Sequence, residues 1–131
     1  MTAPQTPATP RTWTLTFPAG QKLLNANDRM HWAVKRPITK QLRGDAFKLA
    51  KAARVPRLER ARIDCTYEPP DRRRRDAANW SDTAKPLVDG LVDAGVLDDD
   101  GFGYLDGPFM HIGDVHKGGR IVLVITELEV A

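Results

Sequence analysis

Apolar residues gather in four short stretches whose composition and boundaries predict β-strands. Residues 13–17 alternate apolar side chains with threonines, and Pro18 ends the stretch. The Pro69-Pro70 pair ends the second stretch, since proline cannot donate a hydrogen bond within a sheet. Lys117-Gly118-Gly119 separates the last two stretches and is typical of a hairpin turn. We therefore predict strands over 13–17, 58–67, 109–115 and 121–130, the last two paired as a hairpin.

Two longer stretches carry apolar residues at the spacing of a helix. The first is predicted from Ile38 to Ala53, with Pro37 at its start, where the proline ring is tolerated. The second is predicted from Asp82 to Ala94, with Thr83 as a cap and Gly95 at its end. The expected buried faces comprise Ile38, Leu42, Ala46, Leu49 and Ala53 in the first helix and Ala84, Leu87, Val88 and Leu91 in the second.

The order strand, helix, strand, helix, strand, strand predicts a single α+β domain with a mixed sheet. A length of 131 residues agrees with one domain. Residues 1–11 are rich in Thr, Pro and Ala and are expected to form a disordered tail, leaving 12–131 as the domain. Residues 19–37 are expected to form a long polar loop, a kind of segment that is often functional.

Positive and negative side chains are segregated along the chain. Sixteen Lys and Arg against six Asp and Glu lie between residues 22 and 75, whereas three against eleven lie between 76 and 131. A basic region can hold a polyanion, and an acidic region can hold divalent cations. The sole cysteine, Cys65, excludes an internal disulfide. We find no membrane-spanning apolar run and no signal-peptide pattern, so we expect a cytoplasmic protein without membrane contact.

The residues that could carry chemistry lie in the middle of the chain. Four arginines, Arg72 to Arg75, end on Asp76, and Lys85 and then Asp98-Asp99-Asp100 follow. Phosphodiester hydrolysis needs carboxylates that hold Mg²⁺ and positive charge that holds the nucleic acid. The pattern indicates a metal-dependent nuclease if the second helix folds back so that Asp76 and the aspartate run converge. Ordinary turns and solvated patches also contain such runs.

The arginine run, the second helix and the aspartate run form one block of sequence. The block comprises Pro69-Pro70-Asp71-Arg72-Arg73-Arg74-Arg75-Asp76, Asn79, Lys85, Asp89-Gly90-Leu91 and Gly95-Val96-Leu97-Asp98-Asp99-Asp100. It resembles the RusA family of Holliday junction resolvases, which has an arginine-rich run ending in D-x-D-N, a K-x-x-x-D-x-L helix and a D-D pair. Residues 25–32 and 117–126 resemble the family's asparagine-rich loop and its C-terminal hairpin and strand.

The resemblance implies an intertwined homodimer that nicks four-way DNA junctions in recombination and repair. It implies Mg²⁺ as the cofactor, with Mn²⁺ as the alternative, and a bacterial cell as the location, with the gene often carried by a phage or prophage. Catalytic roles are implied for Asp76, Lys85, Asp99 and Asp100, and metal binding for Asp76, Asp99 and Asp100. Asp89 matches the aspartate that follows the helix lysine.

Two features depart from the family pattern. Ala78 stands where the second aspartate of D-x-D-N is expected, and three extra residues separate Asn79 from Lys85. Because a methyl group cannot ligate Mg²⁺, Asp82 is the first candidate to replace the missing ligand and Asp98 is the second. The alternative role for Asp82 is to cap the second helix.

Several basic residues are candidates for contacts with DNA phosphates. The set comprises Arg72, Arg73, Arg74 and Arg75, with Arg29 in the loop and Lys40, Arg43 and Lys51 on the first helix. A solvated helix face, and arginines paired with Asp71 or Glu68, are the structural alternatives.

Three other functions stay open. The first is a junction-binding protein without cleavage, which Ala78 would permit. The second is a nuclease that cuts flaps or nicked duplex, and the third is a phage accessory protein that uses its basic face for assembly.

Overall fold

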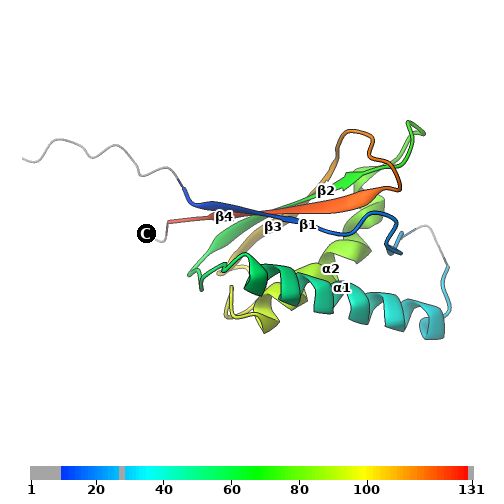
Figure 1. Cartoon of the computed structure of the whole chain (residues 1–131). Helices are drawn as coiled ribbons and strands as arrows, with labels where there is room; N and C mark the ends of the chain where they lie inside the picture. Colours follow the sequence, from blue (N-terminus) through cyan, green and yellow to red (C-terminus); the bar gives the residue numbers. More distant parts are fainter. Residues whose placement is uncertain (1–9, 27–28, 130–131) are drawn as a thin grey trace, which may run out of the picture.

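The computed structural model describes residues 10–26 and 29–129 as a four-stranded sheet with two helices on one side (Figure 1). The elements are β1 (Thr12–Thr16), α1 (Trp32–Ala52), β2 (Ala61–Glu68), the 3-10 helix η1 (Ala77–Trp80), α2 (Ser81–Asp93), β3 (Leu105–Ile112) and β4 (Arg120–Glu127). The strand order across the sheet is β1-β4-β2-β3, with β2 and β3 parallel and the other neighbours antiparallel. The chain is therefore a single α+β domain with a mixed sheet, as the sequence predicted.

Alternate residues of the two central strands form the buried side of the sheet. These residues are Ile63, Cys65 and Tyr67 in β2 and Ile121, Leu123 and Ile125 in β4. The predicted apolar face of α2 is buried in full, and Ile38, Leu42 and Ala46 of α1 are buried with it. Leu49 is partly buried, and the prediction for Ala53 was wrong, because α1 ends at Ala52 and Ala53 is exposed. Burial raises the pKa of the Cys65 thiol to about 12, so this cysteine is a small core residue.

Helix α1 begins at Trp32 rather than at the predicted Ile38. His31 caps the helix, since its Nδ1 accepts a hydrogen bond of 3.1 Å from the backbone N–H of Ala33. Pro37 lies inside the helix, where its missing N–H removes one backbone hydrogen bond. Residues 32–37 are all exposed, so no apolar periodicity marks this first part of the helix in the sequence. The polar loop expected over 19–37 is correspondingly shorter.

The Lys117-Gly118-Gly119 turn does not join neighbouring strands, so the hairpin prediction was wrong. β3 pairs with β2, and β4 lies on the opposite edge of β2. The connection crosses the end of β2, where the N–H of Gly113 donates to the carbonyl of Tyr67 at 2.8 Å and that of His116 to Pro69 at 2.9 Å. The turn itself is present, with both glycines at positive φ. Turn residues determine where the chain changes direction, but they do not determine which strand the following strand pairs with.

Helix α2 anchors the loop that follows β1. Gly95, at φ +82°, ends the helix as predicted. Thr83 is not the cap, because it lies within the first turn and is fully buried. Its hydroxyl donates to the carbonyl of Leu24 and accepts from the N–H of Leu24, both at 2.7 Å. The N–H of Ala26 donates to the carbonyl of Asn79 at 2.8 Å, so the loop is fixed to α2 and to η1.

Most of the expected N-terminal tail, residues 1–9, lies outside the described residues. Arg11 is described and forms a two-point ion pair with Glu127 at the end of β4, with distances of 3.0 and 2.7 Å. Across residues 10–26 and 29–129, no helix is long and apolar enough to cross a membrane.

Gly90 marks a close approach between the two helices. A Cβ at this position would collide with the carbonyl oxygen of Arg43 and lie 2.7 Å from the Cβ of Ala46. We expect Gly90→Ala to push the helices apart and to lower the free energy of unfolding by about 1–3 kcal/mol. Urea unfolding followed by circular dichroism measures the change.

Gly44, in α1, provides the matched control. A Cβ there meets nothing within 4 Å, so Gly44→Ala should stabilise the protein by up to about 1 kcal/mol through helix propensity. Wild-type stability in the Gly90→Ala variant would contradict the helix packing described above.

Candidate functional site

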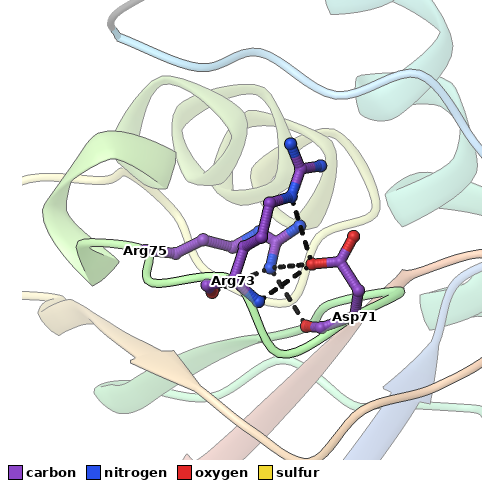
Figure 2. Close-up of polar contacts among 3 residues, drawn as sticks. All are labelled: Asp71, Arg73 and Arg75. Carbon is purple, nitrogen blue, oxygen red and sulfur yellow. Dashed lines mark hydrogen bonds and ion pairs between the residues drawn. The ribbon is translucent and has the colours of Figure 1, made fainter.

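The arginine run lies between β2 and η1 and folds around the carboxylate of Asp71 (Figure 2). Arg75 donates from Nη1 to this carboxylate at 2.8 Å and to the carbonyl oxygens of Asp71 and Arg73, both at 3.0 Å. Arg73 donates to the same carboxylate oxygen from its backbone N–H at 3.0 Å and from Nε at 3.3 Å. The loop is therefore held in shape by ion pairs between its own residues. This agrees with the alternative stated above, in which arginines of the run pair with Asp71.

These contacts divide the four arginines into two groups. The Arg75 side chain is only 12% exposed, and its guanidinium lies 5.9 Å from the centre of the Tyr67 ring. Arg73 also pairs with Asp71 but is largely exposed. Arg72 and Arg74 are exposed, and neither forms an ion pair within the described part of the chain. Arg72 and Arg74 thus keep their charge free for a partner.

Asp71 is kept ionised by its neighbours. The Arg75 guanidinium, together with the backbone N–H of Arg73, holds the pKa of the Asp71 carboxyl well below its usual value. A protonated Asp71 would lose both ion pairs, so the shape of the loop depends on this carboxylate remaining charged.

A cavity of about 630 Å³ opens beside the arginine loop. Its walls are the loop from Arg73 to Asp76, together with Asn25, Tyr67, Asn79 and Trp80. The ring centroids of Tyr67 and Trp80 lie 4.2 Å apart. Sequence reasoning missed these two aromatic residues, although Trp80 directly follows the asparagine of the family motif.

The acidic run folds back along α2 and reaches Lys85, the fifth residue of that helix. The Lys85 ammonium donates to the carboxylate of Asp89 at 3.0 Å and also contacts that of Asp100. Asp100, and then Asp89, raise the pKa of Lys85, and the Lys85 ammonium lowers the pKa of Asp100. The structure thus brings together the helix lysine and two of the carboxylates that the sequence singled out.

The other carboxylates proposed as metal ligands differ in their surroundings. Asp98 pairs with Arg57 through hydrogen bonds of 2.9 and 2.6 Å. Asp76 is the N-cap residue of η1, but its side chain makes no capping hydrogen bond. Asp99 is exposed beside Asp100. Asp82 is exposed in the first turn of α2 and is not its N-cap residue, which is Trp80.

The described residues do not form a preassembled metal centre. Over residues 10–26 and 29–129, no group of three or more His, Cys, Asp or Glu side chains is placed to hold one ion. Mg²⁺ is often bound through one or two carboxylates, with water and substrate phosphate completing its shell. Only a site of this second kind, with one or two carboxylates from the protein, agrees with the described residues.

Basic residues outside the loop differ in whether their charge is paired with a carboxylate. Arg43 of α1 donates to Asp93 of α2 at 2.5 and 2.8 Å, and so joins the two helices. Lys40, Lys51 and Arg29 are exposed. These three remain candidates for phosphate contacts, whereas the charge of Arg43 is already neutralised.

We expect Asp71→Asn to loosen the arginine loop, because an amide cannot replace the ion pairs with Arg73 and Arg75. The pKa of Asp71 is lowered in the folded protein, so its stabilising contribution is complete above the unfolded pKa of about 3.9 and is lost as the pH falls through the folded value. The melting temperature of the variant should therefore be below that of the wild type at pH 7. The difference should shrink below about pH 4.

Asp114→Asn is the control for this experiment. Asp114 is exposed and forms no ion pair among the residues that the structure describes. Equal melting temperatures of wild type and Asp71→Asn at pH 7 would show that Asp71 does not hold the loop.

Comparison with known proteins places the chain in a family. No family model matches it. A curated protein of Xylella fastidiosa (strain Temecula1), described as an uncharacterized protein, is 32% identical over 117 residues. The match covers 86% of this chain and 74% of the other protein. The chain therefore belongs to the same protein family as this Xylella fastidiosa protein.

Proposed function

We propose that the protein is a Mg²⁺-dependent endonuclease that cleaves branched DNA by phosphodiester hydrolysis, as its resemblance to the RusA family implies. The observation that most supports this proposal is the shared cavity of Asp76 with Arg73 and Arg74. A carboxylate next to guanidinium groups is the combination that phosphodiester hydrolysis requires.

A phosphodiester in this cavity would meet groups with separate tasks. The Arg74 guanidinium can bind phosphate oxygens and offset the charge that develops during hydrolysis. Asp76 is the first candidate ligand for Mg²⁺, and Asp99 and Asp100 are the others. Mg²⁺ held by these carboxylates would supply polarisation of the phosphate and a lowered pKa of a water molecule. Lys85 contacts Asp100 and so positions this carboxylate.

We further propose that the active form is a homodimer and that the substrate is a four-way junction. A four-way junction has two equivalent strands to cut, and two sites related by a two-fold axis match that symmetry. A domain of 131 residues buries a limited share of its surface and gains core by pairing. The corresponding biological role is recombination and repair in the bacterial cytoplasm, on chromosomal or phage DNA.

A junction-binding protein without cleavage is the second candidate. Ala78 and the lack of a three-ligand group among the described residues favour it. Wild-type protein that binds junctions but cleaves none with Mg²⁺ or Mn²⁺ would make this reading the better one.

Asp76→Asn should reduce Mg²⁺-dependent cleavage of a labelled four-way junction by about 10²-fold or more, because several kcal/mol of charge stabilisation depend on the metal ligand. Junction binding should be unchanged or tighter, since a negative charge near the phosphate is removed. A gel assay with Mg²⁺ or with EDTA measures both. Asp114→Asn, which changes an exposed carboxylate outside the cavity, should cleave normally.

The same assay tests the other carboxylates. Asp100→Asn should impair cleavage if Asp100 is a ligand, and Asp82→Asn decides whether Asp82 replaces the missing aspartate. Normal turnover by Asp76→Asn would refute the proposed site.

The two groups of arginines should affect DNA binding differently. Each lost phosphate contact flattens the plot of log affinity against log salt by about 0.9. Arg72→Gln with Arg74→Gln should therefore flatten the slope by about two. Arg73→Gln with Arg75→Gln should change the slope less and lower the melting temperature instead, because both residues hold the loop through Asp71. Equal changes in slope for the two pairs would contradict this division.

A further inference from the structure

The cavity beside the arginine loop combines three kinds of group. The aromatic rings of Tyr67 and Trp80 lie against each other, and the other lining residues include the amide-bearing Asn25 and Asn79 and the basic Arg73 and Arg74 of the loop. Unpaired bases are recognised by stacking on aromatic rings and by hydrogen bonds to their edges, while arginine binds their phosphates. The three kinds of group are therefore those that an unpaired nucleotide needs.

We propose that this cavity takes one unpaired nucleotide of the DNA, with its base against Trp80 and its phosphate on Arg74. This inference rests on the proposed function, since the ligand is the DNA that the protein binds. It goes further by naming the part of the substrate that is recognised and the feature that selects branched DNA.

The size of the cavity suits this ligand. Sites for small molecules have volumes of about 300–1,000 Å³, and the volume here is about 630 Å³. The loop contributes Arg73, Arg74 and Arg75 together with Asp76, and the rest of the lining is mainly aromatic and amide residues, so a phosphate and a base would each meet matching groups.

The walls of the cavity are fixed before any ligand binds. Tyr67 is 7% exposed at the end of β2, and a Cβ on Gly119 would lie 3.3 Å from its hydroxyl and 3.0 Å from Cδ of Pro70, so the turn closes directly behind it. The loop that carries Asn25 is held by the hydrogen bond from Ala26 to Asn79. A preformed site loses little conformational freedom on binding, which favours affinity.

Such a cavity would distinguish branched from linear DNA. A nucleotide in a perfect duplex must leave its stack and its partner, at a cost of a few kcal/mol, before it can enter. At the crossover of a junction, nucleotides can be splayed out at lower cost. The cavity would therefore add affinity for branched DNA and little for duplex.

The test compares a four-way junction with a linear duplex of the same sequence, in EDTA so that no cleavage occurs. Trp80→Leu should weaken junction binding by about 5- to 150-fold, the range for one lost stacked base, and leave duplex binding unchanged. Trp80→Phe keeps an aromatic ring and should retain most of the preference. Trp32→Leu, at a tryptophan that is 66% exposed and outside the cavity, is the matched control and should change neither.

Fluorescence gives a second readout that does not depend on how Trp80→Leu folds. The chain has three tryptophans, so Trp13→Phe with Trp32→Phe leaves Trp80 as the sole indole. Its emission should be quenched on titration with the junction and not with the duplex. Quenching that is equal for the two DNAs, or absent for both, would overturn the inference.

The inference and the nuclease proposal can fail separately. Cleavage in Mg²⁺ together with an unaltered junction preference in Trp80→Leu would remove the cavity from recognition and leave the nuclease intact. A junction preference that depends on Trp80, without cleavage by the wild type in Mg²⁺ or Mn²⁺, would support the cavity and refute the nuclease.

Discussion

The candidate site depends on one constraint, which is that β2 pairs with another strand along each of its two edges. With β4 on one edge and β3 on the other, the chain between β3 and β4 has to cross the end of β2. That crossing is fixed by backbone hydrogen bonds to Tyr67 and Pro69. The arginine loop leaves β2 at the same end, and this loop, η1 and the loop that follows β1 line the cavity there.

Ion pairs between the basic and the acidic halves of the sequence partly neutralise both in the folded protein. Arg43 pairs with Asp93, Arg57 with Asp98 and Arg120 with Glu68, so each of these three pairs joins the basic and the acidic halves. Exposed ion pairs of this kind contribute at most about 1 kcal/mol each to stability. Their larger effect is to remove charge from the surface available to a polyanion and to leave the free positive charge on fewer residues, among them Arg72 and Arg74.

The sequence predicted those parts of the fold that depend on burial. The apolar face of α2, most of that of α1, the presence of four strands and the glycine that ends α2 follow from periodicity or from backbone freedom at positive φ. The bounds of β3 were not predicted, since it spans Leu105–Ile112 rather than 109–115. The start of α1 was not predicted, because its first turns bury nothing, and the partner of β4 was not predicted, because it is a property of the whole sheet. Thr83 was predicted to cap α2 because a threonine hydroxyl can hydrogen-bond to backbone groups at a helix start. In the structure it hydrogen-bonds to the backbone of Leu24 instead.

The site was predicted only where it is charged. Arginine and aspartate runs are conspicuous in a sequence, and the structure places Asp76 beside Arg73 and Arg74. Tyr67 and Trp80 were missed because an aromatic residue at a strand end or beside a helix usually belongs to the core. They line a cavity because the loop that follows β1 lies beside them. Hydrogen bonds to Thr83 and Asn79, which are distant in the sequence, hold this loop in place.

The start of β1 and the end of β4 lie side by side and are joined by the ion pair between Arg11 and Glu127. Both lie where β2 begins, whereas the cavity lies where β2 ends, roughly 20 Å away along the strand. A fluorescent protein or an affinity tag joined directly to Arg11 or Glu127 would therefore begin at the end of the sheet that is remote from the cavity.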